Sequence, residues 1–270
     1  MILAGGFWDA SIGRLGRPAD TRERVTANMH LYAVLPRVLD LARLDDAATG
    51  IARDMDVSIA FAVRGGPYVA LDFKRGSGGA RRTGLADVVL FFPSCRHLNR
   101  MFGGEKATPI PLWGLHRFRD LQRFTKLSDR LTQYLKPSDD DMADPCFRKR
   151  HVELSLLVGL AACREVADLD PRAQRVATAL HDGTIQYSVG EEGPHVTAKV
   201  EHGTISVAPG RVPDPTTTIA LRDLDFAVAL IRGEVDTFAA SGLGDIRLSG
   251  DLALADKFNH LFDRVGLYLK

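Results

Sequence analysis

Gly66-Pro-Tyr-Val69 and Gly193-Pro-His-Val196 repeat one turn signal 127 residues apart. Gly104-Glu105 recurs as Gly233-Glu234 at a spacing of 129. Near the end of each half an apolar set also recurs at 127: Leu127, Leu131, Tyr134 and Leu135 against Leu254, Phe258, Leu261 and Phe262. A repeat of so long a period indicates a duplicated domain rather than a solenoid unit.

The residues around each turn predict strands. Short β-prone runs flank both Gly-Pro turns as hairpins, at 59–63 with 68–73 and at 185–189 with 196–200. The second half predicts a further strand at 203–207. The equivalent stretch, 77–83, is rich in glycine and arginine, so we expect the first half to have lost or loosened this strand. Later strands are predicted at 88–92 and 217–221, then near 115–118 and at 246–248.

Helices are predicted from apolar residues at steps of three and four. The pattern at 22–44 contains Pro36, where we expect a kink or break. Helices after Ser94 and Asp223, which are N-cap residues, end before Gly104 and Gly233. The second half is expected to open with helices at 150–164 and 173–180, and each half closes with an amphipathic helix.

These elements predict an α+β protein of two tandem domains. We expect an N-terminal arm at 1–20, a divergent first domain at 21–136, a linker at 137–149 and a second domain at 150–270. The linker is short, acidic and bounded by Pro137 and Pro145, which is typical of a domain boundary.

Composition excludes several classes of protein. With 35 basic and 34 acidic side chains, the net charge of +1 gives no global attraction to nucleic acid. Local basic clusters occur at 81–82 and 148–150, where solvated loops are favoured over contacts with phosphates or headgroups. Three widely spaced cysteines argue against a disulfide framework and favour a reducing cytoplasm. We expect no cofactor and no metal.

The second half resembles the sterol carrier protein family, the type-two lipid-transfer domain. The resemblance rests on four segments in order: Asp182-Gly183, Thr217 to Leu224, Arg232-Gly233-Glu234, and Ile246 to Leu252 running into the last helix. It covers about 150–269 and extends more faintly to about 22–135. It implies a domain with a mostly antiparallel sheet of about five strands, covered on one face by helices over an apolar lipid tunnel. It also implies a carrier without a catalytic centre.

The first half departs from this pattern. Gly250-Asp251 has no clear counterpart there, and charged residues crowd the segment 117–123. The chain ends at Lys270 without a Ser-Lys-Leu peroxisomal address. Because the first half departs from the family pattern, we expect the lipid tunnel in the second domain and leave open whether the first has one.

Eight apolar residues are predicted to line the tunnel: Phe226, Leu230, Ile231, Phe238, Leu254, Phe258, Leu261 and Phe262. Spacing alone favours an ordinary filled core, and only the resemblance favours a tunnel. Burying about ten methylenes of an acyl chain offers about 8 kcal/mol, enough for micromolar binding after the costs of association.

The leading hypothesis is a cytoplasmic, non-catalytic carrier of a fatty acid, acyl-coenzyme A, sterol-like or isoprenoid lipid. Its partners would be this small hydrophobic ligand and, transiently, a membrane or an enzyme. The first alternative is an accessory protein that presents a lipid or quinone-like intermediate to a biosynthetic enzyme. The second is an enzyme such as a thioester hydrolase, using Cys95 or a histidine. Cys95 and His97 are two positions apart on a helix, which places them on different faces.

Overall fold

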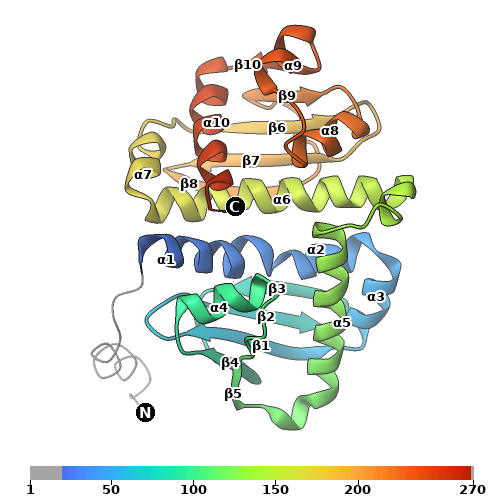
Figure 1. Ribbon diagram of the computed structural model, residues 1–270, viewed down its shortest axis with the longest axis vertical. Helices are drawn as coiled ribbons and strands as arrows, with labels where there is room; N and C mark the ends of the chain where they lie inside the picture. Colours follow the sequence, from blue (N-terminus) through green and yellow to red (C-terminus); the bar gives the residue numbers. More distant parts are fainter. Residues whose placement is uncertain (1–19, 269–270) are drawn as a thin grey trace.

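Two five-stranded sheets with the same strand order form the framework of the protein (Figure 1). The structure is a computed structural model and describes residues 20–268. The first sheet contains β1 (Asp56–Val63), β2 (Tyr68–Lys74), β3 (Ser77–Arg81), β4 (Val88–Phe92) and β5 (Ile110–Trp113), in the order β3-β2-β1-β4-β5. The second contains β6 (Gly183–Val189), β7 (His195–Glu201), β8 (Thr204–Pro209), β9 (Thr217–Leu221) and β10 (Ile246–Gly250), in the order β10-β9-β6-β7-β8.

The helices are also arranged in two sets. The first half has α1 (Thr21–Asn28), η1 (Met29–Val34), α2 (Arg37–Leu44), α3 (Asp46–Arg53), α4 (Cys95–Phe102), η2 (Leu115–Arg117) and α5 (Phe118–Leu135). The second half has η3 (Asp141–Ala143), α6 (Pro145–Leu169), α7 (Pro171–Ala177), α8 (Leu224–Ile231), α9 (Thr237–Leu243) and α10 (Leu252–Gly266). The predicted α+β class with two tandem, mostly antiparallel sheets is therefore confirmed.

The Gly-Pro turns form the two predicted hairpins. Each first strand pairs antiparallel with the next and parallel with the fourth, as in Ile59 opposite Val88 and Ile185 opposite Thr217. A Cβ on Gly193 would lie 1.7 Å from the carbonyl oxygen of Val189, so only glycine fits this turn.

Three expectations about the first half were wrong. The strand expected to be lost or loosened at 77–83 is present as β3, because backbone pairing with β2 needs no large side chains. The last strand is β5 at 110–113, and the residues near Leu115 form the 3-10 turn η2 instead. Gly250 does have a counterpart, Gly114. Both have positive φ at the end of the edge strand, and a Cβ on either would meet a carbonyl oxygen at 2.4 Å or less.

The two C-terminal helices correspond at a spacing of 134, not 127. Helix α5 begins at Phe118 and α10 at Leu252, and their buried residues then match in order, as Phe124 with Phe258 and Leu127 with Leu261. The two spacings differ by seven residues, which is about two helical turns. An alignment at 127 therefore still matches the apolar face of one helix with the apolar face of the other.

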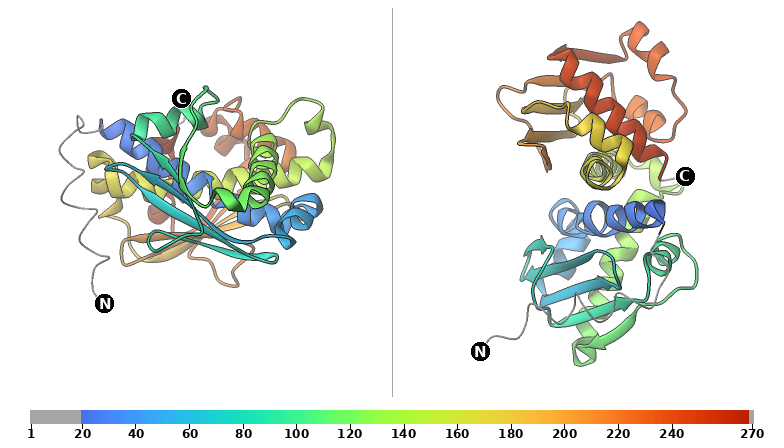
Figure 2. Two further views of the ribbon diagram at one scale, coloured as in Figure 1. Left: turned by 90° about the horizontal axis from the view of Figure 1, so that it is seen from below. Right: turned by 90° about the vertical axis from the view of Figure 1, so that its left-hand side faces the viewer.

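A layer of helices joins the halves (Figure 2). The chain from α1 through η1 ends at the break predicted at Pro36, and α2 follows. Helix α6 packs against this layer and also covers the second sheet, so Val25 and Met29 share a core cluster with residues of the second half. Helix α6 starts at Pro145, inside the segment expected to be linker. The buried carboxylate of Glu165 on α6 pairs with Arg82, which stacks 3.8 Å from the ring centre of Tyr32.

Each half contains one buried aspartate held by an arginine of its C-terminal helix and by a tyrosine in or just after that helix. Asp45 accepts hydrogen bonds from Arg130 at 2.7 and 2.6 Å and from Tyr134 at 2.8 Å. Asp170 is paired with Arg264 and accepts from Tyr268 at 2.7 Å. Both aspartates also cap the next helix through backbone N–H groups. We call these sets the Asp-Arg-Tyr clusters. Each cluster links the start of an early helix, α3 or α7, to the last helix of the same half, α5 or α10.

The Asp-Arg-Tyr clusters predict loss of stability in acid. Burial alone would raise the pKa of Asp45 and Asp170, but the hydrogen bonds that each carboxylate accepts lower it to about 2. A depressed carboxyl pKa stabilises the fold above the unfolded value near 3.8 and loses that contribution as pH falls towards 2. Each cluster then contributes on the order of 2 kcal/mol at neutral pH.

His30 extends this acid sensitivity to higher pH. Burial lowers its pKa to about 4, so the unfolded chain takes up this proton first and stability falls from about pH 6.5 downwards. We expect urea midpoints to decrease in two stages between pH 7 and 2. A Tyr134→Phe, Tyr268→Phe double variant should show a smaller lower stage, and a midpoint independent of pH would contradict this account.

Candidate ligand groove

An open groove of about 400 Å³ lies between α8 and α9 in the second domain. Its apolar lining comes from one helix on each side and the segment between them: Phe226, Ala229, Val235, Ala239, Ala240 and Leu243. This volume lies within the range of about 300–1,000 Å³ that is typical of small-molecule sites.

Two aspartates fix the helices that form the groove. Asp223 accepts a hydrogen bond of 2.8 Å from the N–H of Phe226 and so begins α8. Asp236 accepts bonds of 2.9 and 3.2 Å from the N–H groups of Phe238 and Ala239 and so begins α9. Gly233, with φ of +72°, ends α8 and lets the chain turn directly into the second wall.

The rim of the groove is acidic. Four carboxylates line it, from Asp225, Glu234, Asp236 and Asp245, against one guanidinium, from Arg222. Arg222 is paired at 2.7 Å with Asp245. This rim disfavours an anionic group of a ligand and tolerates a neutral one.

Exposed apolar side chains lie beside the groove. Phe238 on α9 is 90% exposed and Leu243, at the end of the same helix, is 79% exposed. Two large exposed apolar side chains on one short helix leave apolar surface available for an interaction.

The eight residues predicted to line the tunnel occupy different places. Phe226 alone of them lines the groove. Leu254, Phe258 and Leu261 on α10 are fully buried in the core, with Leu230 and Phe262 partly buried against it. Ile231 and Phe238 are exposed at the surface.

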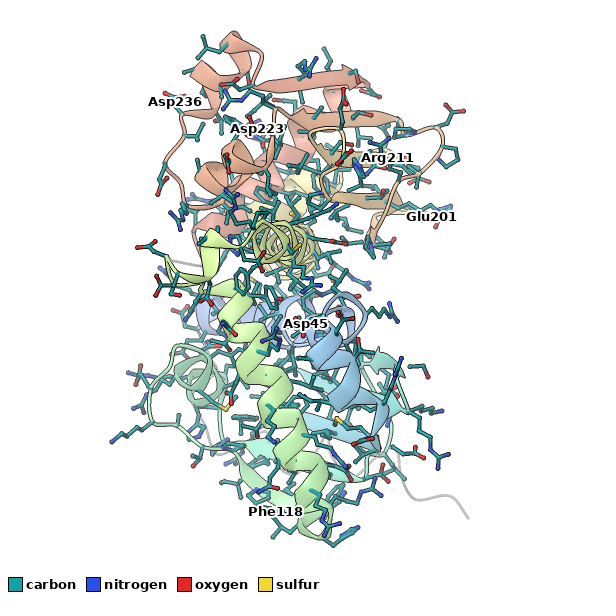
Figure 3. All side chains as sticks on the ribbon, turned by 90° about the vertical axis from the view of Figure 1, so that its right-hand side faces the viewer. Asp45, Phe118, Glu201, Arg211, Asp223 and Asp236 are labelled. Carbon is teal, nitrogen blue, oxygen red and sulfur yellow. The ribbon has the colours of Figure 1, made fainter. Side chains whose placement is uncertain are left out.

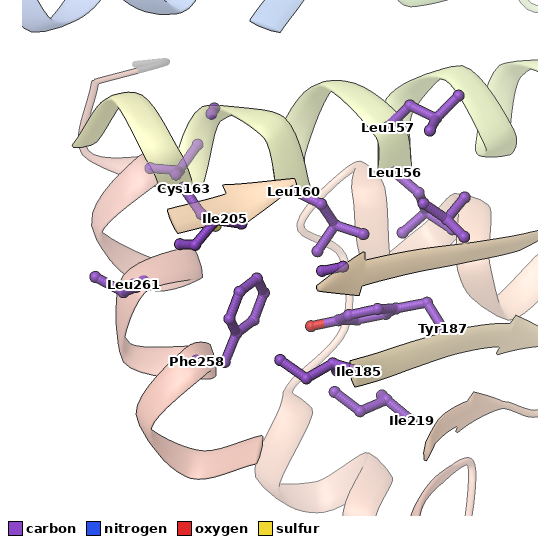
Figure 4. Packing of buried hydrophobic residues seen from close by; sticks show 14 of the residues in the cluster. Leu156, Leu157, Leu160, Cys163, Ile185, Tyr187, Ile205, Ile219, Phe258 and Leu261 are labelled. Carbon is purple, nitrogen blue, oxygen red and sulfur yellow. The ribbon is translucent and has the colours of Figure 1, made fainter. Parts of the chain in front are cut away.

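The buried core behind the groove contains a tyrosine, Tyr187, that the sequence did not identify as a possible ligand contact. Tyr187 points from β6 towards Phe258 of α10, in the space beneath α6 (Figure 4). Burial raises the pKa of its hydroxyl above the usual range. This hydroxyl forms no hydrogen bond with the residues described, 20–268. The alternation of Ile185, Tyr187 and Val189 was the signal that could have identified it.

The first domain differs at the equivalent of α10. Its α5 carries a buried carboxylate, Asp120, at the position of Leu254, and Arg117 and Arg123 pair with it at 2.8 and 3.3 Å. A smaller cavity of about 160 Å³ lies elsewhere in this domain, between η1 and the arginines of β3 and the loop after it. The first domain therefore has a buried carboxylate with two arginine partners where the second has a buried leucine.

Cys95 and His97 do not form a nucleophile and base pair. Cys95 is buried, and burial raises the pKa of its thiol, which makes a thiolate less accessible. The His97 ring instead contacts the carbonyl oxygen of Thr108 at 2.9 Å. Among residues 20–268, no three His, Cys, Asp or Glu side chains are grouped to hold a metal ion. In the same part of the chain, no helix is long and apolar enough to cross a bilayer.

A mostly antiparallel sheet under helices, with an apolar groove between two of them, defines a small ligand-binding α+β domain. Residues 163–263 match the model of the SCP-2 sterol transfer family. The resemblance inferred for the second half is thereby confirmed.

Several solved structures are similar to this chain. A UbiJ-SCP2 ubiquinone synthesis protein is 16% identical, with 36% of this chain and 79% of that one covered and a TM-score of 0.29. Palmitated SCP2L2 from Aedes aegypti is 21% identical, covers 36% and 93%, and has a TM-score of 0.26. Sterol carrier protein domain 2 of Helicoverpa armigera is 18% identical, covers 41% and 87%, and has a TM-score of 0.31. No curated protein sequence matches significantly.

Proposed function

We propose that the second domain binds and carries one neutral, apolar lipid that enters through the groove between α8 and α9. The observation that carries this proposal is the groove itself, apolar inside and flanked by exposed Phe238 and Leu243, within the part of the chain that matches a sterol transfer family. Non-catalytic carriage is part of the proposal.

The ligand passes Phe226 and reaches the core lined by α10. Phe226 is the link, because it lines the groove and belongs to the same apolar cluster as Phe258 and Leu261. The other residues proposed to line the bound state, Leu230, Leu254 and Phe262, belong to or pack against that cluster. Binding therefore requires α8 and α9 to move apart from the core.

The charge of the rim narrows the class of ligand. A fatty acid carboxylate or the phosphates of acyl-coenzyme A would meet four carboxylates at the groove. Like charges repel, so an anionic head group would be held less tightly at this rim than a neutral one. A sterol-like or isoprenoid lipid with a hydroxyl or carbonyl group avoids this cost.

A direct test compares a neutral and an anionic probe. We expect fluorescent dehydroergosterol to bind the full chain more tightly than cis-parinaric acid, which carries a carboxylate. The preference should shrink in an Asp225→Asn, Glu234→Gln variant, because two rim charges are removed. Equal affinities in both proteins would contradict the role of the rim, and no binding of either probe would contradict the proposed function.

Tyr187 is expected to orient the polar group of the ligand. A Tyr187→Phe variant should keep its urea midpoint, since the hydroxyl makes no hydrogen bond with the described residues. It should lose about 1 kcal/mol of affinity, or about fivefold, for a sterol. Cholestane, which lacks the hydroxyl, should bind both proteins alike. A variant that binds the sterol unchanged would show that Tyr187 only fills the core.

A further inference from the structure

The outer edge of the first sheet carries a group of exposed apolar side chains that the ligand groove does not explain. We name it the β5 edge, formed by five residues that are each at least 42% exposed: Ile110, Leu112, Trp113, Leu115 and Phe118. Strand β5 is the last strand of its sheet, η2 follows it, and Phe118 begins α5. Figure 3 shows Phe118 at one end of the molecule, far from Asp236 at the other.

The charges around the β5 edge are mostly positive. Residues 93–126 contain seven arginines and lysines against two acidic residues. Four of these cations, Arg96, Lys106, Arg119 and Lys126, are exposed and form no ion pair with residues 20–268. Adding the bordering Asp54, Asp56 and Asp87 together with Arg75 still leaves eight basic against five acidic side chains.

The matching part of the second domain has the opposite charge. Residues 222–260 contain four arginines and lysines against seven acidic residues. Leu252, at the position equivalent to Phe118, is also exposed, at 58% against 60%. The duplicated fold therefore has the same apolar position at both ends, but only the first domain combines it with positive charge.

We infer that the β5 edge docks on the surface of an anionic lipid bilayer. An interfacial site needs apolar and aromatic side chains that enter the headgroup region and cations that meet anionic lipids. Trp113 fits the first requirement, because its ring is half exposed while its Nε1 donates a 3.0 Å hydrogen bond to the carbonyl oxygen of Ala86. Arg119, beside Phe118, fits the second.

Two features disfavour a second copy of this chain at the same edge. Pro111 lies within β5 and has no N–H to donate, which weakens edge-to-edge pairing of strands. Two β5 edges would also bring their excess positive charges together. A bilayer with anionic headgroups has neither obstacle. This inference does not depend on the ligand of the second domain.

The test uses the full chain and vesicles of phosphatidylcholine with or without phosphatidylglycerol. In a Trp8→Phe background, Trp113 is the one tryptophan left in the sequence and reports on the β5 edge. We expect its emission to shift to shorter wavelength with phosphatidylglycerol vesicles, and the protein to sediment with them. Both effects should weaken as salt is raised.

Matched variants separate the β5 edge from the rest of the surface. Arg119→Glu changes two units of charge and should weaken vesicle binding on the order of tenfold or more. Phe118→Ser should also weaken it, whereas Leu252→Ser, at the equivalent position of the second domain, should not. Equal binding to both kinds of vesicle, or equal loss with Leu252→Ser, would overturn the inference. A vesicle-independent increase in particle size with protein concentration, abolished by Phe118→Ser, would also overturn it and assign the edge to another copy.

Discussion

Asp170→Ala is expected to destabilise the second domain by about 3–5 kcal/mol, because it leaves Arg264 without its partner and removes the cap of α7. Tyr268 would also lose its hydrogen-bond acceptor. The midpoint of urea unfolding, followed by far-ultraviolet circular dichroism, should fall on the order of 1 to 2 M. Asp45→Ala should have a similar effect in the first domain, since the cluster is duplicated.

The control for this prediction is Asp168→Ala. Asp168 lies two residues before Asp170, in the last turn of α6, and is half exposed, with its carboxylate 3.9 Å from Arg164. An exposed pair of this kind contributes at most about 0.5–1 kcal/mol. Similar midpoints for Asp168→Ala and Asp170→Ala would show that the buried cluster is not what stabilises the domain.

Ala229→Trp is expected to abolish measurable binding of a neutral lipid. Ala229 lies on α8, half buried, and its side chain lines the groove. An indole at this position would fill part of the 400 Å³ and block the way past Phe226. We expect at least about a tenfold loss of affinity for dehydroergosterol, or about 1.4 kcal/mol.

Ala253→Trp provides the matched control. Ala253 is exposed on the first turn of α10 and lines neither of the two cavities described above. Its substitution should leave both the fold and the affinity unchanged. If the two tryptophan variants bind the sterol alike, the entrance does not lie between α8 and α9.

Local patterns predicted most of the elements correctly. The Gly-Pro turns, the alternation in β6 and the caps Ser94 and Asp223 are decided by neighbours in the sequence, and each lies where expected. Strand β3 was missed because its stability comes from pairing with β2 rather than from its own side chains.

The duplication was placed correctly in the sheets and incorrectly in the last helix. An apolar stripe repeats after seven residues, so spacings of 127 and 134 predict the same face. Gly114 and Gly250 would have fixed the true spacing. A side chain is excluded at these two positions by the carbonyl oxygens of Asp87 and Thr216, which are distant in the sequence. The sequence alone does not show these contacts.

The site was the least predictable part. Whether Leu254 and Phe258 border a cavity or fill a core depends on how far α8 and α9 lie from the sheet. The spacing of apolar residues along one helix does not predict that distance. The partners in the Asp-Arg-Tyr clusters are similarly remote, with Asp170 and Arg264 separated by 94 residues.

The central claim is that the second domain takes up one neutral lipid molecule. Native mass spectrometry of the full chain, after incubation with a sterol and removal of the excess, measures this directly. We predict one bound sterol per chain for the wild type and for Ala253→Trp, and none for Ala229→Trp. A wild-type spectrum that shows only the free chain at every sterol concentration would contradict the account.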